Sequence, residues 1–213
     1  MAALEGGKHG IAFSSGMASA DSCMKLLSQG DHVVCCDDVY GGTARLFNNL
    51  MTNYGVEFSY VDSQVASNVE EAIRPETKMV WVETPTNPLL KVTDLEAVGK
   101  IAKSHGLLYV VDTTFATPVF LRPLEYGADL VLHSTTKYLS GHNQIIGGVI
   151  VTDRAALFAR LKYIQKSVGA VPSPFDCWLV IMGLKLSHIH ISEPTRLLSR
   201  AFSGVCLKKK KGG

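Results

Sequence analysis

Short apolar segments recur along this chain, and their spacing is the feature that most constrains its fold. Each has the length of a strand and is rich in β-branched or aromatic residues. Several are almost continuously apolar, as strands are when both of their faces are covered. The segments are His32–Cys36, Val56–Val61, Met79–Glu83, Leu107–Val111, Asp129–His133 and Gly148–Val151.

Segments with a helical pattern separate these predicted strands. They are Ser15–Ser28, Thr93–Ser104 and Arg154–Ser167, and Thr93 with Glu96 forms a capping-box pattern at the start of the second. This alternation predicts an α/β fold, with a mostly parallel sheet sandwiched by helices. Ligands of such sheets bind beyond the carboxyl ends of the strands, so a functional site is expected at that edge.

The chain of 213 residues changes character near residue 186. Residues 1–186 show no internal repeat and no linker, so we expect them to form one large domain. Residues 187–213 have no clear strand period and only a weak helical one, and they contain the lysine run Lys208–Lys211. We expect this tail to be disordered or a sequence artefact, and a genuine basic tail is the alternative.

Composition and spacing argue against several classes of protein. A formal net charge of +2 indicates no nucleic-acid partner, and no uncharged apolar run approaches the roughly 18 residues of a membrane span. The cysteines form no Cys-x-x-Cys pair, and the histidines show no metal-ligand spacing, so neither a disulfide framework nor a metal site is expected. No Gly-x-Gly-x-x-Gly follows a strand, which argues against a dinucleotide-binding fold. The first residues lack the regions of a signal peptide, and a cytoplasmic protein is expected.

Lys137 is the residue most indicative of chemistry. It follows the predicted strand Asp129–His133, with the hydroxyls of Ser134 and Thr136 just before it and a glycine close behind. A lysine at the end of a sheet, beside hydroxyls that can bind phosphate, suits a Schiff base with pyridoxal 5′-phosphate (PLP). A lone loop lysine is usually a surface residue, so this interpretation depends on neighbours that bind the rest of the cofactor.

Two further segments supply such neighbours. Ser14-Ser-Gly-Met17 leads into a predicted helix, and the first amides of that helix, at Gly16 and Met17, form an anion site; a plain N-cap is the alternative. Asp112 follows the strongest apolar strand, where its carboxylate can hold a pyridinium nitrogen so that the ring accepts electrons. A helix cap or a salt bridge is the alternative for a lone aspartate, but the position one crossover before Lys137 favours the cofactor.

Two loops complete the predicted site. Glu83-Thr-Pro-Thr-Asn-Pro88 follows a strand, and its prolines make a rigid loop from which Asn87 can aim an amide into the site. Tyr40 lies beside two glycines after another strand, where its ring can stack on a flat cofactor and its hydroxyl can move protons. A packed surface tyrosine is the alternative. Arg45 is a candidate contact for a phosphate or a carboxylate.

Together these motifs resemble the Cys/Met-metabolism PLP-dependent enzymes of fold type I. The matching segments keep the order of that family over roughly residues 2 to 186. Besides the motifs already described they include Val111-Asp-Thr-Thr-Phe115, Ser134-Thr-Thr-Lys-Tyr138 and Gly169-Ala-Val-Pro-Ser-Pro174. The last of these favours the branch of the family that cleaves cystathionine. The resemblance implies the large PLP-binding domain of such an enzyme.

The resemblance also implies a role for each matching residue. Lys137 would carry the Schiff base, Asp112 would hold the pyridine nitrogen and Tyr40 would stack on the ring, and these three are the expected catalytic residues. The substrate side is expected to include Arg45, Asn87 and Glu83. The full set expected to bind the cofactor is Gly16, Met17, Tyr40, Asn87, Asp112, Thr114, Ser134, Thr136 and Lys137.

The activity implied is γ-elimination of the amino acid cystathionine, giving cysteine, 2-oxobutanoate and ammonia, by a homo-oligomer that is a tetramer in its full-length form. Two alternatives stay open. One is a γ-replacement enzyme of the same family, in which a nucleophile adds at the γ-carbon. The other is a catalytically inactive, truncated fragment.

The chain departs from the family pattern in several places. Asn143 and Gln144 stand where the family usually has small polar residues, and Met182 stands where many relatives have an arginine. The family's N-terminal arm, which gives a tyrosine and an arginine to a neighbouring subunit's phosphate site, is not visible. Neither is the C-terminal domain, which supplies the arginine for the substrate carboxylate. On this pattern we expect the chain by itself to be inactive.

Overall fold

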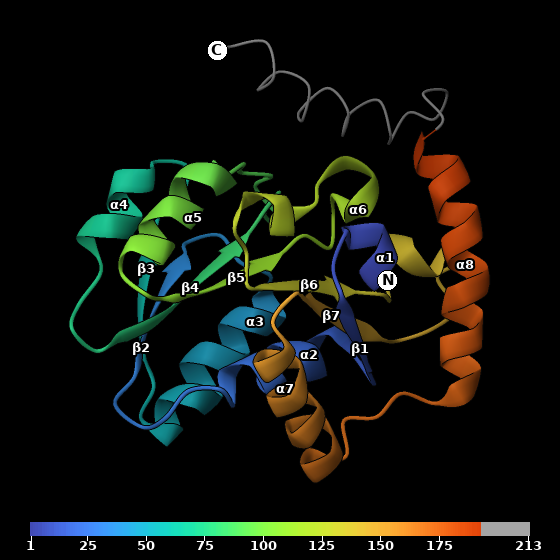
Figure 1. Ribbon diagram of the computed structural model, residues 1–213, viewed down its shortest axis with the longest axis horizontal. Helices are drawn as coiled ribbons and strands as arrows, with labels where there is room; N and C mark the ends of the chain where they lie inside the picture. The colour runs from blue at the N-terminus through green and yellow to red at the C-terminus, as the bar shows by residue number, and fades with distance from the viewer. Residues whose placement is uncertain (193–213) are drawn as a thin grey trace.

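The apolar segments of the chain pair side by side in one seven-stranded sheet, which lies between layers of helices in the computed structural model (Figure 1). The structure describes residues 1–192. In space the strands follow the order β1-β7-β6-β5-β4-β2-β3. They are β1 (His9–Phe13), β2 (His32–Cys36), β3 (Glu57–Val61), β4 (Thr77–Glu83), β5 (Leu108–Asp112), β6 (Leu130–Ser134) and β7 (Gly148–Thr152).

Strands β3, β2, β4, β5 and β6 are parallel neighbours, while β7 is antiparallel to β6 and β1 is antiparallel to β7. The predicted mostly parallel α/β sheet is therefore confirmed. The sequence pattern does not predict β1. This edge strand buries only alternate residues, Ile11 and Phe13, so it lacks the continuous apolar character of the central strands.

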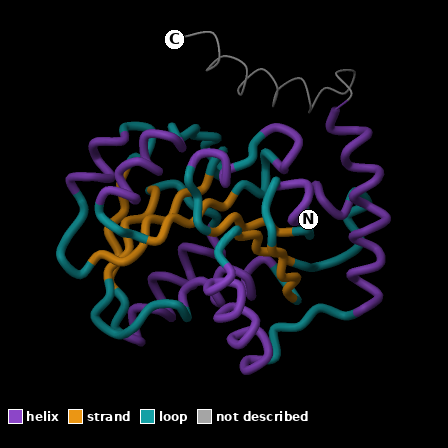
Figure 2. Tube along the Cα trace, viewed as in Figure 1, coloured by secondary structure: helices purple, strands orange, loops and turns teal. Residues whose placement is uncertain are grey.

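Helices cover both faces of the sheet (Figure 2). They are α1 (Ala2–Glu5), α2 (Gly16–Met24), α3 (Gly41–Arg45), α4 (Ala66–Glu71), α5 (Leu95–Ser104), α6 (Thr117–Phe120), α7 (Ala155–Val168) and α8 (Pro174–Ser192). Helix α3 runs on into a π-helical turn, η1 (Leu46–Leu50), and a 3-10 turn, η2 (Met51–Tyr54); η3 (Pro123–Tyr126) and η4 (Tyr138–Ser140) are further 3-10 turns.

Two helix boundaries differ from the sequence pattern. Helix α2 ends at Met24 instead of residue 28, because the chain turns there through short-range backbone bonds. The capping-box prediction for Thr93 is wrong: Asp94 caps α5 by accepting a hydrogen bond from the Ala97 amide at 3.1 Å. The Thr93 hydroxyl pairs instead with the hydroxyl of Ser63, at 2.7 Å.

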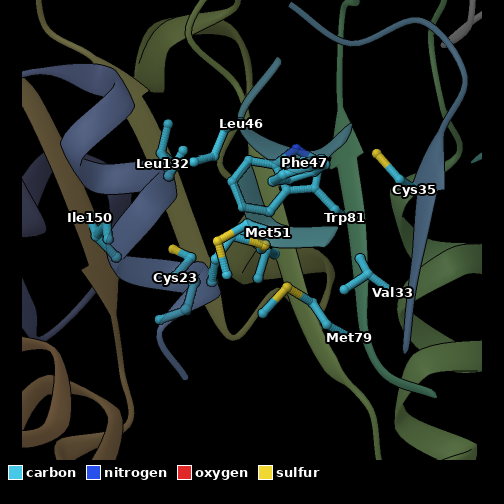
Figure 3. Packing of buried hydrophobic residues seen from close by; sticks show 14 of the residues in the cluster. Cys23, Val33, Cys35, Leu46, Phe47, Met51, Met79, Trp81, Leu132 and Ile150 are labelled. Carbon is cyan, nitrogen blue, oxygen red and sulfur yellow. The ribbon is translucent and has the colours of Figure 1, made fainter. Parts of the chain in front are cut away.

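Successive residues of the central strands point into the two hydrophobic cores on opposite faces of the sheet. Trp81 of β4 packs edge-on against Phe47 of η1, with ring centroids 5.2 Å apart, in the core under α2, α7 and η1 (Figure 3). Its neighbours Val80 and Val82 point to the other face, where they join the apolar residues of α4 and α5. This alternation is the period-2 geometry of a strand. Full burial of an aliphatic or aromatic side chain contributes about 1.5–3 kcal/mol, so both cores hold the sheet firmly.

Helix α1 is attached to the sheet by a buried polar pair. His133 of β6 hydrogen-bonds through Nε2 to the Oε1 atom of Glu5, and neither side chain is exposed. Because an uncompensated buried carboxylate is costly, this bond stabilises the docking of α1.

Helix α8 crosses residue 186, where the sequence changes character, and continues to Ser192. Residues 187–213 were expected to form a disordered or artefactual tail, and from residue 193 onward that prediction concerns residues outside the described part of the chain. Within the part of the chain that the structure describes, no helix combines the length and the apolarity needed to cross a bilayer.

Candidate active site

The loops that follow β2, β4, β5 and β6 meet around a cavity of about 240 Å³ at the carboxyl ends of these strands. Parallel strands bring their carboxyl ends to one edge, which is why motifs far apart in the sequence converge there. Of the residues predicted from sequence, the cavity lining includes Gly16, Met17, Tyr40, Glu83, Asn87, Asp112, Thr114, Ser134, Thr136 and Lys137.

Asp112 is a buried carboxylate at the end of β5. The Thr114 hydroxyl donates to its Oδ1 at 2.6 Å and the Thr114 amide donates to the same atom at 3.0 Å. Both bonds go to Oδ1, so Oδ2 receives no hydrogen bond from residues 1–185. Burial raises the pKa of Asp112, while the bonds from Thr114 and the charge of His133 oppose that rise. A cationic partner in the cavity would favour the ionised form further.

Thr114 links Asp112 to the neighbouring strand. Its hydroxyl oxygen accepts a hydrogen bond from the Ser134 amide at 2.9 Å while it donates to Asp112. The ends of β5 and β6 are thereby connected through one side chain. Thr114, predicted to line the cofactor site, therefore has a second task, which is to orient the Asp112 carboxylate.

The N-terminus of helix α2 lies against Ser134. Ser15 is the N-cap and accepts from the Ala18 amide at 2.9 Å, which leaves the amides of the first helical residues directed outward. A Cβ atom on Gly16 would lie 2.8 Å from the Cβ of Ser134, so only glycine permits this approach. Helix-terminal amides beside a hydroxyl form a site that suits a phosphate.

The hydroxyl of Thr136 is already engaged in this structure. It accepts from the Gly147 amide at 3.1 Å and lies 3.2 Å from the Gly147 carbonyl oxygen, to which it donates. Thr136 lines the cavity as predicted, but a phosphate would compete with Gly147 for this hydroxyl.

Lys137 lines the cavity from its exposed rim, at the start of η4. Among the side chains of residues 1–185, none forms an ion pair with its ammonium group. The amine is therefore not tied to a carboxylate and can react with a carbonyl in the cavity.

Glu83 joins two loops of the site through its carboxylate. Oε2 accepts from the Tyr40 amide at 2.8 Å, and Oε1 accepts from the Asn87 amide at 3.0 Å. Burial, and secondarily the charge of Asp112, raise the pKa of Glu83 to about 9. Sequence reasoning assigned Glu83 to the substrate side; in the structure its oxygens hold the backbone of the loops that present Tyr40 and Asn87.

The Tyr40 ring lies at the mouth of the cavity and is 40% exposed, which leaves it open to stacking. A Cβ atom on Gly42 would lie 2.4 Å from the ring and 2.8 Å from Met17 Sδ, so the glycine makes room for both side chains. Asp38 fixes the same pair of loops, because it accepts from the Thr86 hydroxyl and from the Leu89 amide, the latter at 2.9 Å. The X-Pro bonds at Pro85 and Pro88 are both cis.

Arg45 is the one predicted site residue that the structure does not bring into the cavity. It ends helix α3, is exposed and is not part of the lining. Its contact with a phosphate or a carboxylate stays a prediction.

Some lining residues were not predicted from sequence. Leu132 lies directly opposite Asp112 in the sheet and two residues before Ser134, so the strand period could have placed it on the cavity face. Thr43 lies one helical turn after Tyr40, a spacing that also indicates a shared face. Ser15, Ala20, Pro85, Phe115 and Ile146 complete the lining.

The residues present fit PLP. A free carboxylate oxygen, an unpaired lysine, an exposed aromatic ring and an anion site lie around one cavity, and each matches one part of that cofactor. Within residues 1–192, no group of three or more His, Cys, Asp or Glu side chains could hold a metal ion.

Comparison with known proteins gives a consistent result. Residues 1–196 match the model of the Cys/Met metabolism PLP-dependent enzymes. A probable cystathionine γ-synthase of Herpetosiphon aurantiacus is 48% identical over 92% of this chain and 61% of its own length. A cystathionine β-lyase of Coxiella burnetii is 51% identical over 91% of this chain and 50% of its own.

A solved structure agrees in both fold and sequence. The crystal structure of cystathionine γ-lyase from Lactobacillus plantarum, complexed with L-serine, aligns with a TM-score of 0.87 and 44% identity over 88% of this chain and 49% of that one. The chain thus spans about half to three fifths of the length of the relatives it matches.

Proposed function

The chain belongs to the Cys/Met metabolism PLP-dependent enzyme family, and on that premise we propose that it forms the cofactor-binding part of a lyase that breaks the bond between sulfur and the γ-carbon of cystathionine. The observation that carries this proposal is the convergence of Lys137, Asp112 and Tyr40 on one cavity. When bound, PLP supplies an electron sink for a carbanion at the amino acid's α-carbon.

The residues of the chain would then have separate tasks. Asp112, through its free Oδ2, would hold the pyridine nitrogen and favour its protonated form. Lys137 would bind the cofactor through its amine and, once released by the amino group of a substrate, would move the α-proton. Tyr40 would cover the ring, with its position set by Glu83.

The phosphate of the cofactor would be bound by the amides of Gly16 and Met17 and by the Ser134 hydroxyl. Thr136 would join them by exchanging its bonds with Gly147 for bonds to the phosphate. Asn87 would contact the cofactor from the loop that Glu83 holds. Arg45 would reach a substrate carboxylate only after a movement of its exposed side chain.

The choice of γ-elimination comes from Gly169-Ala-Val-Pro-Ser-Pro174, the stretch between α7 and α8. The relatives named above carry out, by their names, three different reactions of cystathionine metabolism. A γ-replacement enzyme is therefore the second candidate. A PLP-binding protein without catalytic activity is the third.

Product analysis separates these candidates. The purified chain, loaded with PLP, is supplied with cystathionine, and 2-oxobutanoate and pyruvate are measured. Release of 2-oxobutanoate supports the proposal and would overturn the expectation that this chain by itself is inactive, whereas pyruvate indicates β-elimination. Formation of cystathionine from cysteine and an activated homoserine ester, without release of 2-oxobutanoate, indicates γ-replacement.

Borohydride reduction tests the cofactor lysine directly. It should attach PLP irreversibly to the peptide that contains Lys137, and Lys137→Ala should abolish this label. Attachment at another lysine would refute the site assignment. A label at Lys137 without any product would support the non-catalytic candidate.

A further inference from the structure

The backbone of helix α8 touches the turn that follows Lys137. Gly183, a buried residue of α8, lies so close to Ser140 that a Cβ atom at 183 would be 1.8 Å from the Ser140 carbonyl oxygen. A Cβ atom on Gly141 would in turn lie 2.8 Å from the Gly183 carbonyl oxygen. The two backbones are in direct contact, and the space between them admits no side chain at position 183.

The turn touched by α8 is the one that holds Lys137. The hydroxyl of Ser140, which is fully buried, donates to the Lys137 carbonyl at 3.1 Å and approaches the Thr136 carbonyl at 3.4 Å. The Ser140 amide donates to the same Lys137 carbonyl at 3.3 Å, and the His142 amide donates to the Ser140 carbonyl at 2.8 Å. Any displacement of Ser140 therefore moves the peptide groups on both sides of the lysine.

We propose that Gly183 is a positioning residue for Lys137: by seating α8 on the backbone of Ser140 and Gly141, it fixes where the lysine amine enters the cavity. This inference rests on the proposed role of Lys137 in binding the cofactor. A side chain at 183 would push the turn and misdirect the amine, since a shift of about 1 Å in a reacting group can lower a rate by as much as a hundredfold.

For the stability of the Gly183→Ala variant, the proposal predicts the opposite of what helix propensity predicts. Alanine is favoured over glycine inside a helix by about 1 kcal/mol, so without the contact Gly183→Ala would stabilise α8. With the contact, the variant should unfold at lower urea concentration. It should also form the PLP bond at Lys137 at least about tenfold more slowly than the parent chain, as measured by borohydride trapping at timed intervals.

Gly99 provides a matched control. It is a buried glycine within helix α5, where a Cβ atom would lie 2.3 Å from the Tyr126 carbonyl oxygen, so alanine there creates a similar backbone clash away from the cavity. Gly99→Ala should lower the urea midpoint but keep the trapping rate per folded molecule. Equal slowing in both variants would show that loss of stability alone explains the effect, and this would overturn the proposal.

A second readout needs no cofactor. Reductive methylation of Lys137, compared by mass spectrometry with that of exposed Lys78, reports the environment of the amine directly. A changed ratio in Gly183→Ala and an unchanged ratio in Gly99→Ala support the proposal, whereas parent-like trapping and methylation in Gly183→Ala refute it.

Ser140→Ala covers the case in which Gly183→Ala does not fold. This substitution leaves the backbone contact between Gly183 and the turn intact but removes the hydrogen bond from the Ser140 hydroxyl to the Lys137 carbonyl. Slower trapping and a changed methylation ratio would support the coupling of this turn to the lysine, and parent-like values would refute it. If the parent chain itself shows no label at Lys137, the proposed function fails, while the methylation ratio still tests the positioning role.

Discussion

Replacing Glu83 with glutamine tests whether this carboxyl group carries a proton in the folded chain. Burial and the nearby Asp112 raise the pKa of Glu83 from 4.5 to about 9. Between these two values the folded chain binds more protons than the unfolded chain. A group with a raised pKa contributes stability that is complete below its unfolded pKa and is lost as the pH rises through its folded pKa. One proton gives a slope of about 1.4 kcal/mol per pH unit in the free energy of unfolding.

The window from about pH 7 to about pH 8.5 lies above the ordinary pKa of histidine. Burial also raises the pKa of the Cys23 and Cys35 thiols, which adds a small loss of stability near the upper end of the window in the parent chain and in the variant alike. Over that window the parent chain should lose about 2 kcal/mol more unfolding free energy than Glu83→Gln loses. Glutamine also has one acceptor where glutamate has two, so the amide of Tyr40 or Asn87 loses its partner. This loss costs about 1–3 kcal/mol and lowers the whole curve without changing its slope.

The assay is urea unfolding of the chain without cofactor, followed by circular dichroism at a series of pH values. Glu96→Gln is the control, because Glu96 is an exposed glutamate paired with Lys100 on the surface of α5. It should keep the slope of the parent chain. An unchanged slope in Glu83→Gln would mean that Glu83 is ionised in the folded chain, and the reasoning from its burial would be wrong.

Further substitutions test other contacts of the site and the sheet. Asp112→Asn should keep the fold, because the neutral amide is buried at no greater cost than the carboxylate. PLP affinity, measured by absorbance titration, should fall about tenfold to a hundredfold, since a hydrogen bond to a charged group contributes about 1.5–3 kcal/mol. Unchanged affinity would reject the role of Asp112. Thr114→Val should lower the free energy of unfolding by about 1–3 kcal/mol, because it leaves the Ser134 amide without its acceptor; an unchanged urea midpoint would contradict this. Burial, and then the charge of Arg74, lower the pKa of His32, so this imidazole should subtract stability as the pH falls below about 6.5, against the gain that Glu83 brings over the same range, and His32→Gln should remove that subtraction; parallel curves for the two proteins would argue against this cause.

The parts of the fold that were predictable are those with local signals. Central strands such as His32–Cys36 are buried on both faces, so their apolar character is continuous and visible in the sequence. The edge strand β1 buries only two side chains, and among residues 174–185 of helix α8 only Gly183 is buried, so both elements carry a weaker pattern. Their existence depends on pairing and packing with residues far away in the chain.

The site shows the same division. Lys137 and Asp112 follow strong strands, so their place at one edge of the sheet follows from the topology. The contacts of Glu83 could not be read from sequence, because they require the loops after β2 and β4 to meet. The exposed position of Arg45 depends on the angle at which α3 leaves Tyr40, and no local motif determines that angle.

The position of β1 at the edge of the sheet sets the order in which the chain can assemble. Within residues 1–192 its strand partner is β7 alone, with His9 opposite Thr152, so about 140 residues are synthesised after His9 before its partner exists. At about 5–20 residues per second, the N-terminal segment waits on the order of ten to thirty seconds after its own synthesis. During that time Ile11 and Phe13 have no sheet to pack against, and Glu5 has not met His133. Closing so long a loop is slow, which makes the docking of β1 a late step and leaves the edge of β7 open to mispairing until it occurs.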